Sequence, residues 1–197
     1  MYLSSQIIGV IAVIIGFAGY APYLLNTFRG QTKPHFFSWL IWAALELISF
    51  GIQIKNGAGA GAWVTLFSGF IAFVIAVWAL KYRQINITKV DWVCLIGAGI
   101  SLVLWFGFNN PILASIFLAL TDFFAFIPTY RKSWKTPYEE TLFEYGMSSL
   151  KWVVAFFAFS QFTLANMIYP AYLAVANGAF VVYALIRRRA LRNQPVT

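Results

Sequence analysis

The segment PYLLNTFRGQTKP, residues 22–34, closes the first long apolar run of the chain, and the segment PTYRKSWKTP, residues 128–137, closes the fifth. In each copy a proline stands one or two helical turns before the run ends. Five residues later come a hydroxyl residue, an aromatic residue and a cation, Thr27-Phe28-Arg29 and Ser133-Trp134-Lys135. Two apolar helices resemble each other easily by chance, so the matching loop residues carry the evidence for an internal repeat.

Each copy also ends in a second proline, Pro34 or Pro137, and one two-residue gap at Gly30-Gln31 aligns the copies. A proline suits the first turn of a helix, where its missing N–H has no partner to lose. We therefore expect each of these prolines to open the next helix. A shorter match relates residues 62–70 in the third run to residues 171–179 in the seventh.

The composition of the chain is that of a membrane protein. Of its 197 residues 61% are hydrophobic and only 10% are charged, and the mean hydropathy is +0.75. A soluble domain carries about 25% charged residues, so lipid is the solvent that accepts this surface. The 19% aromatic residues suit a protein that meets two membrane–water interfaces.

Seven apolar runs are long enough to cross a bilayer or nearly so. They cover residues 7–25, 36–54, 61–80, 92–108, 112–130, 142–162 and 167–186. The breaks between them carry Gly, Pro, Asn and charged residues, which favour turns and loops. The break between the sixth and seventh runs is nearly apolar, so hydropathy alone leaves a six-helix count open.

The distribution of cations decides between the two counts. With the N-terminus outside and seven spans, twelve of the 14 Lys and Arg residues fall in inside loops, and only Lys55 falls outside. Positive inside loops set the orientation of membrane proteins, and fusing the last two runs would move the arginines at 187–192 outside. We predict seven spans in a bacterial inner (plasma) membrane, with a cytoplasmic C-terminus. Because the cations lie in short loops, the net charge of +8 does not indicate a nucleic-acid partner.

The repeat and the span count together predict the domain organisation. Residues 1–84 form a first three-helix unit, 85–110 a linker helix, 111–190 a second three-helix unit, and 191–197 a cytoplasmic tail. The linker helix makes the first helices of the two units run in the same direction, so the units are related by an axis along the membrane normal.

This organisation resembles that of the PQ-loop superfamily, which includes the SWEET and SemiSWEET sugar transporters, cystinosin-like exporters and KDEL receptors. The motif evidence is limited to the two proline segments and Asn177-Gly178. The Pro-Gln pair of that family reads here as Pro22-Tyr23 and Pro128-Thr129. The resemblance implies that Pro22 and Pro128 are hinges for alternating access and that Asn177 faces a solute, with Ser68 at the matching place in the first unit.

Ionisable residues inside the predicted spans are costly in hydrocarbon and should face the bundle interior. Asp122 and Glu46 lie near the middle of their runs, where each could take up a proton or could lock helix packing by a hydrogen bond. We expect Glu144 to join Glu139 and Glu140 near the inside interface. Lys151 is a possible partner of Asp122.

Further polar and aromatic residues complete the predicted solute site, namely Trp63, Tyr172, Gln53 and Gln161 beside Asn177 and Ser68. The single cysteine excludes an internal disulfide, and Cys94 with one histidine gives no metal-ligand spacing. No nucleophile–base or nucleotide-binding pattern occurs in the sequence. We therefore expect neither an enzyme nor a cofactor nor a metal site.

The sequence thus predicts an alternating-access transporter of a small polar solute, such as a sugar. Transport could be coupled to protons, and the chain could form a homo-oligomer. One alternative is a receptor or sorting protein of the same fold that binds a peptide or lipid head group without transport. Another is a scaffolding subunit. Because Asp122 and Asn177 align with Gly16 and Ser68, we expect more of the cavity's chemistry on the second unit.

Overall fold

The chain folds into helices over the part that the computed structural model describes, residues 2–82 and 88–192, and no strand occurs in these ranges. The predicted all-α class is therefore confirmed. The α-helices are α1 (Tyr2–Phe28), α2 (Phe36–Lys55), α3 (Ala60–Ala79), α4 (Lys89–Leu102), α5 (Pro111–Lys135), α6 (Leu142–Phe156) and α7 (Leu164–Arg192). A π-helical turn, Val103–Gly107, extends α4, and short 3-10 turns lie at Leu80–Tyr82 and Pro137–Glu139.

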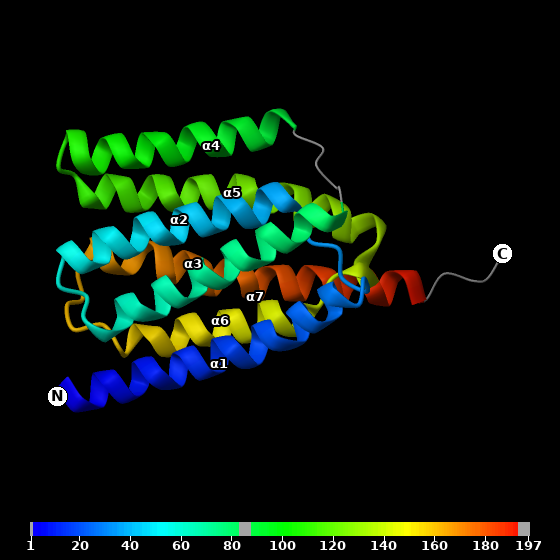
Figure 1. Cartoon of the computed structure of the whole chain (residues 1–197), viewed down its shortest axis with the longest axis horizontal. Coiled ribbons are helices and arrows are strands. Elements are labelled where there is room, and N and C mark those ends of the chain that lie inside the picture. Colours follow the sequence, from blue (N-terminus) through cyan, green and yellow to red (C-terminus); the bar gives the residue numbers. More distant parts are fainter. Residues whose placement is uncertain (1, 83–87, 193–197) are drawn as a thin grey trace.

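Consecutive helices run in opposite directions along one bundle (Figure 1). Helix α1 begins at the end that also carries the α2–α3, α4–α5 and α6–α7 turns, and α7 ends at the opposite end. We call the end where α1 begins the N-terminal end. The opposite end carries the cations of the α1–α2 connection and of the last turns of α5, and we call it the basic end.

Five of these helices, α1, α2, α3, α5 and α7, are long and apolar enough to cross a membrane. The other two are shorter: α4 reaches membrane-like apolarity only over Trp92–Gly107 with its π-helical turn, and α6 has 15 residues. Large apolar side chains such as Phe17, Phe70 and Val175 point outward, as lipid-facing residues do. The described helices thus fit a multi-pass membrane protein.

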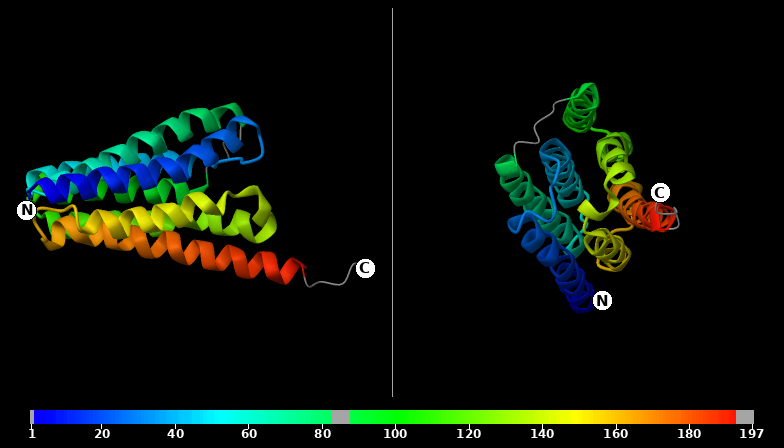
Figure 2. Two further views of the ribbon diagram at one scale, coloured as in Figure 1. Left: turned by 90° about the horizontal axis from the view of Figure 1, so that it is seen from below. Right: turned by 90° about the vertical axis from the view of Figure 1, so that its right-hand side faces the viewer.

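Helix packing follows a simple order. Helix α3 packs between α1 and α2, and α7 packs between α5 and α6, while α4 lies at the edge against α5 and α2 (Figure 2). Across the middle of the bundle, α1 packs on α6 and α2 packs on α5. Close approach of α1 to α6 depends on Gly19, where a Cβ atom would come within 2.7 Å of the Met147 Cβ.

The two loop prolines do not open α-helices as predicted. Helix α2 begins after His35, whose ring accepts a hydrogen bond from the Ser38 backbone N–H at 3.4 Å, and Pro34 stands before this cap. Pro137 opens a 3-10 turn, and α6 begins only at Leu142. The side-chain cap and the bonds that hold the α5–α6 connection decide these boundaries, and neither can be read from a proline alone.

The sixth apolar run is shorter in the structure than in the prediction, because α6 ends at Phe156. The apolar residues that follow form a turn that pairs with the α2–α3 turn: the Gly61 N–H donates to the Ala158 carbonyl (3.1 Å), and the Ser160 N–H donates to the Ala58 carbonyl (2.9 Å). Buried turn residues are as apolar as helix residues, so hydropathy missed this helix end. The predicted boundary at 84/85 and most of the tail lie outside the described residues, and the domain division stays a prediction.

Candidate functional site

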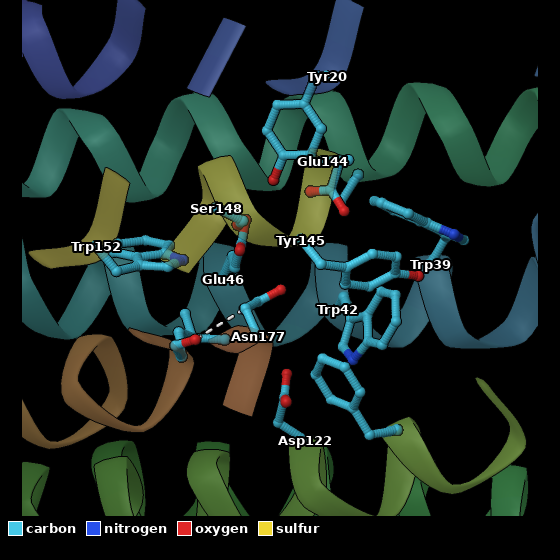
Figure 3. A pocket seen from close by; sticks show the side chains of 13 residues that line it. Tyr20, Trp39, Trp42, Glu46, Asp122, Glu144, Tyr145, Ser148, Trp152 and Asn177 are labelled. Carbon is cyan, nitrogen blue, oxygen red and sulfur yellow. Dashed lines mark hydrogen bonds between the residues drawn. The ribbon is translucent and has the colours of Figure 1, made fainter. Parts of the chain in front are cut away.

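A polar cavity lies halfway along the bundle, between the helices that the two halves contribute (Figure 3). The space within it that is open to the centre of a water-sized molecule measures about 30 Å³, so the void between the lining side chains is larger than this figure. Residues from α1, α2, α3, α5, α6 and α7 line it. They are Tyr20, Trp39, Trp42, Glu46, Ala72, Asp122, Phe126, Glu144, Tyr145, Ser148, Trp152, Leu173 and Asn177. Most of them come from the second half of the chain.

Three carboxyl groups line this cavity, those of Glu46, Asp122 and Glu144, with side chains that leave 6%, 0% and 3% of the residue exposed. The Tyr169 hydroxyl donates to Asp122 Oδ1 at 3.1 Å. Among the described residues, one oxygen of Glu46 and one of Glu144 have no hydrogen-bond partner. The second oxygen of Asp122 has none within 3.5 Å, although the Tyr172 hydroxyl interacts with that carboxyl. Buried polar atoms are nearly always paired, so the orphaned oxygens of Glu46 and Glu144 in one cavity point to a ligand or water there.

Glu144 lies deeper than predicted. It interacts electrostatically with Glu140, as expected, but its side chain lines the central cavity. Residue 144 lies in the first turn of α6, and the tilt and depth of that helix bring its side chain inward. Because the depth of a helix end is a tertiary property, counting residues from the predicted interface could not reveal it.

Lys151 is fully buried beside the cavity and is bonded to neutral groups. Its ammonium donates to Ser68 Oγ (2.5 Å) and to the Tyr20 hydroxyl (3.2 Å). The nitrogen also lies 4.9 Å from the centre of the Tyr20 ring and 4.6 Å from that of the Trp152 ring. The suggested partnership with Asp122 does not occur, because Asp122 bonds to Tyr169 instead.

Lys151 nevertheless compensates acidic charge in the cavity. It interacts electrostatically with Glu46 and Glu144, but among the described residues no ion pair within 4 Å includes it. Gly16 of α1 makes room for its aliphatic stem, since a Cβ at that glycine would lie 2.8 Å from the Lys151 Cδ. The lysine thus lies where the two halves meet. It interacts electrostatically with a carboxyl group from each half but forms no direct ion pair with either.

One wall of the cavity is aromatic. Trp42 lies edge-on to Trp39 (centroids 5.1 Å apart) and tilted against Phe126 (4.8 Å), which in turn contacts Tyr145 (6.4 Å). The Trp39 indole N–H donates to the Tyr23 hydroxyl at 3.2 Å, whereas the Trp42 indole N–H has no partner. The wall therefore offers ring faces and one unused hydrogen-bond donor.

The structure gathers some of the predicted site residues at this cavity. Asn177, Asp122 and Glu46 line it. Ser68 does not, but Lys151 bonds both to Ser68 and to Tyr20, which lines the cavity. The Asn177 Nδ2 donates to the Leu173 carbonyl at 2.8 Å, drawn as a dashed line in Figure 3, which leaves its amide oxygen as the group to meet a ligand. Gly178 faces Ser149 of α6 and so serves helix packing.

The other predicted solute contacts lie elsewhere. Tyr172 does not line the cavity but stacks on Tyr169, with ring centres 6.3 Å apart, and its hydroxyl interacts with the Asp122 carboxyl. Gln53 is buried between Ser49 and Thr65, to which its amide is hydrogen-bonded. Trp63 is 59% exposed on the outer surface, and Gln161 is exposed in the α6–α7 turn. Trp63 was predicted as a solute contact because it aligns with Tyr172 in the repeat. The direction in which its side chain points depends on the rotation of α3 about its axis, which sequence spacing does not determine.

The predicted hinge prolines lie inside uninterrupted helices. Pro22 falls within α1 and Pro128 within α5, although the side chain of Pro128 lies outside the described part of the structure. The sequence analysis missed a third proline inside a helix, Pro170 of α7, which is buried one residue from Tyr169. Each such proline removes one helical hydrogen bond and weakens the helix at that point.

At the basic end, side chains join the α1–α2 connection to the α5–α6 connection. The Lys132 ammonium donates to Glu140 Oε1 (2.7 Å) and to the Lys33 carbonyl (2.6 Å), and Lys33 pairs with Glu139 at 3.5 Å. Burial raises the pKa of Glu140, although the neighbouring Lys132 counteracts this effect. The Thr141 hydroxyl lies 2.7 Å from that of Thr32.

At the N-terminal end the same two halves meet through backbone. The pairing of Gly61 with Ala158 and of Ser160 with Ala58 is reinforced by Asn166, whose amide nitrogen donates to the Asn56 carbonyl at 3.2 Å. Bonds across the halves therefore close both ends of the bundle around the central cavity.

Among the described residues no group of three or more His, Cys, Asp or Glu side chains is arranged to hold a metal ion. The three cavity carboxyls come from three different helices, α2, α5 and α6. The sequence matches no protein-family profile and no curated protein, and no solved structure matches the chain.

Proposed function

We propose that this chain is a seven-span membrane carrier that moves a small polar solute by alternating access, with its N-terminus outside and its basic end in the cytoplasm. The observation that carries the proposal is the buried cavity with its orphaned carboxyl oxygens, closed at both ends by bonds between two halves of one bundle. A structural core would have no reason to leave costly polar groups unpaired at mid-depth.

Helix packing supports the two-unit architecture. If α1, α2 and α3 are exchanged for α5, α6 and α7, the set of packed helix pairs remains the same: α1 on α6 becomes α5 on α2, and α2 on α7 becomes α6 on α3. Helix α4 has no counterpart. Such a pattern is expected for parallel repeats related by an axis along the membrane normal, and it agrees with the PQ-loop resemblance, which we retain as part of the proposal.

The two end closures suggest how the carrier works. In the proposed cycle, loss of the bonds from Lys132 to Glu140 and to the Lys33 carbonyl opens the cavity to the cytoplasm. Loss of the backbone pairing of the α2–α3 and α6–α7 turns opens it outward. Pro22 and Pro128 lie in the first helix of each half, where a missing helical hydrogen bond permits bending. Asp122 or Glu46 would take up the coupling proton.

Accessibility of the cavity from both sides tests alternating access. In a Cys94→Ala background, Ser148→Cys places one thiol in the cavity, and membrane-impermeant maleimide is added to either side of sealed vesicles. We expect labelling from both sides. Gln161→Cys and Lys135→Cys, exposed at opposite ends, are the controls and should each react from one side only.

Labelling of Ser148→Cys from one side alone would contradict the carrier and would favour the receptor, which the basic end could suit by attracting an acidic head group or peptide tail. Solute flux gives the second criterion. Vesicles that contain the purified protein should take up at least one member of a panel of sugars, amino acids, amines and vitamins, whereas a receptor would bind without flux.

A further inference from the structure

We propose that the solute of this cavity is a small organic cation, a compound with a protonated nitrogen and a hydrogen-bond acceptor nearby. The proposal rests on the carrier function above and specifies its substrate class. Three observations support it: the excess of carboxyl groups, the carboxyl oxygens without a hydrogen-bond partner among the described residues, and the aromatic wall.

The charge balance of the cavity is acidic. Glu46, Asp122 and Glu144 line it, whereas Lys151 is the one buried cation beside it in the described ranges, and its ammonium is already bonded to Ser68 and Tyr20. Uncompensated carboxylates in a low-dielectric interior are costly. A cationic solute would supply the missing positive charge.

The three carboxyl groups of the cavity differ from an ordinary cluster of acidic residues because some of their buried oxygens lack a hydrogen-bond partner. The side chains of Glu46, Asp122 and Glu144 are each more than nine-tenths buried. Within the part of the chain that the structure describes, one oxygen of Glu46 and one of Glu144 have no partner, and only the Tyr172 hydroxyl interacts with the otherwise unbonded side of Asp122. The three side chains line the same small cavity, from α2, α5 and α6 respectively (Figure 3). An N–H donor within the cavity would satisfy these acceptors, and an ammonium provides up to three.

The aromatic wall fits the cationic part of such a solute. Trp39, Trp42, Phe126 and Tyr145 form a continuous set of rings along the cavity, and cations bind favourably over the faces of Trp, Tyr and Phe. Lys151 demonstrates the same preference inside this protein, since its nitrogen lies over Tyr20 and Trp152. The free indole N–H of Trp42 and the amide oxygen side of Asn177 add polar recognition.

Two other ligand classes fit less well. A metal cation needs oxygens that converge within about 2.6 Å of one point, and the described residues provide no such group. A neutral sugar would stack on the aromatic wall and satisfy the oxygens with its hydroxyls. It would, however, leave the acidic charge of the cavity uncompensated unless protons neutralise the carboxyls.

Pairs of probes that differ only in charge test the proposal on the wild-type protein. Purified protein is titrated with choline and with its uncharged carbon analogue dimethylbutanol, and with benzylammonium and benzyl alcohol. Calorimetry and quenching of tryptophan fluorescence report binding. We expect at least one cation to bind about tenfold or more tightly than its neutral analogue, as desolvated cation–π contact and ion pairing predict.

Conservative variants then locate the site. Glu46→Gln and Asp122→Asn should each weaken binding of the cation about tenfold or more while they leave the neutral analogue unaffected. Glu139→Gln, the same change at a partly exposed carboxylate of the basic end, is the matched control and should bind like the wild type.

The outcomes separate this inference from the carrier function. Equal binding of charged and neutral analogues, binding of sugars alone, or no binding of either cation at roughly 10 mM, well above a millimolar Kd, overturns the cation proposal and leaves the carrier intact if another solute shows flux. Selective cation binding without uptake into vesicles overturns the carrier and retains the cation site.

Discussion

The ammonium of Lys151 in α6 lies 2.5 Å from Ser68 Oγ in α3, so that a buried charged hydrogen bond joins the two halves of the bundle at its centre. Ser68 donates its own hydroxyl proton to the Val64 carbonyl at 3.0 Å, which directs an oxygen lone pair toward the lysine. Gly16 leaves the space that the lysine stem occupies. This bond links the stability of the bundle to the charge of its cavity.

Replacement of this lysine should therefore destabilise the protein strongly. Lys151→Met keeps the length of the stem but removes the charge that opposes Glu46 and Glu144, and it leaves buried acidic charge unbalanced. We expect a loss of about 3 kcal/mol or more, measured as a lower Tm in detergent. Lys135→Met, at an exposed position, is the control and should change the Tm little.

Glu144→Gln combined with Lys151→Met should restore part of that stability, because it removes one of the unbalanced carboxylates. If Lys151→Met proved as stable as Lys135→Met, or if the second substitution restored nothing, the lysine would not compensate the cavity carboxylates.

Lys132 should control opening at the basic end. Lys132→Met removes the hydrogen bonds to Glu140 Oε1 and to the Lys33 carbonyl. Hydrogen bonds to charged groups stabilise a fold by about 1.5–3 kcal/mol each. We expect a maleimide added on the basic side to label Ser148→Cys about tenfold faster in this variant, with no increase from the opposite side.

The neighbouring ion pair provides the comparison. Lys33 and Glu139 pair at 3.5 Å with about 42% and 35% of their side chains exposed, and such pairs contribute little. Lys33→Met should leave labelling of Ser148→Cys nearly unchanged. An equal acceleration by both substitutions would mean that general charge, rather than the Lys132 contacts, holds this end closed.

Gly59 should be critical for closure at the N-terminal end. It has a φ of +66°, and a Cβ there would overlap the Ser160 side chain, 2.9 Å from its Cβ. Ser160 cannot move away freely, because its N–H is bonded to the Ala58 carbonyl. We expect Gly59→Ala to lower stability by about 1–3 kcal/mol more than backbone strain alone.

Gly30→Ala measures that strain by itself, since Gly30 has a φ of +75° with no atom within 4 Å of its Cβ position. The difference in unfolding free energy between the two variants isolates the contact with Ser160. Equal losses would show that the two turns need no close approach.

Proton coupling should depend on one of two carboxyls. In vesicles with an imposed pH gradient, uptake of the transported solute should exceed uptake without a gradient in the wild type. Asp122→Asn or Glu46→Gln should abolish that excess, while solute exchange without a gradient should continue once the solute concentration is raised above the weakened Kd of the variant. Unchanged stimulation in both variants would exclude both carboxyls as the coupling group.

The sequence predicted the all-helical class, the membrane-type helices and several residues of the cavity. Apolar runs and intervening polar breaks are local properties, and one-dimensional hydropathy records them directly. Asp122, Glu46 and Asn177 could be singled out because an ionisable or amide side chain inside an apolar run has few alternatives to an interior position.

What tertiary structure alone decided was which of these groups meet. Glu144 and Lys151 both entered the centre of the bundle, Trp63 turned outward, and α6 ended at Phe156, because helix depth and rotation are set by packing between halves that are distant in sequence. The composition of PYLLNTFRGQTKP and its repeat determined where the chain turns. The contacts across the two halves determined where its charges face one another, since those contacts exist only once the bundle has formed.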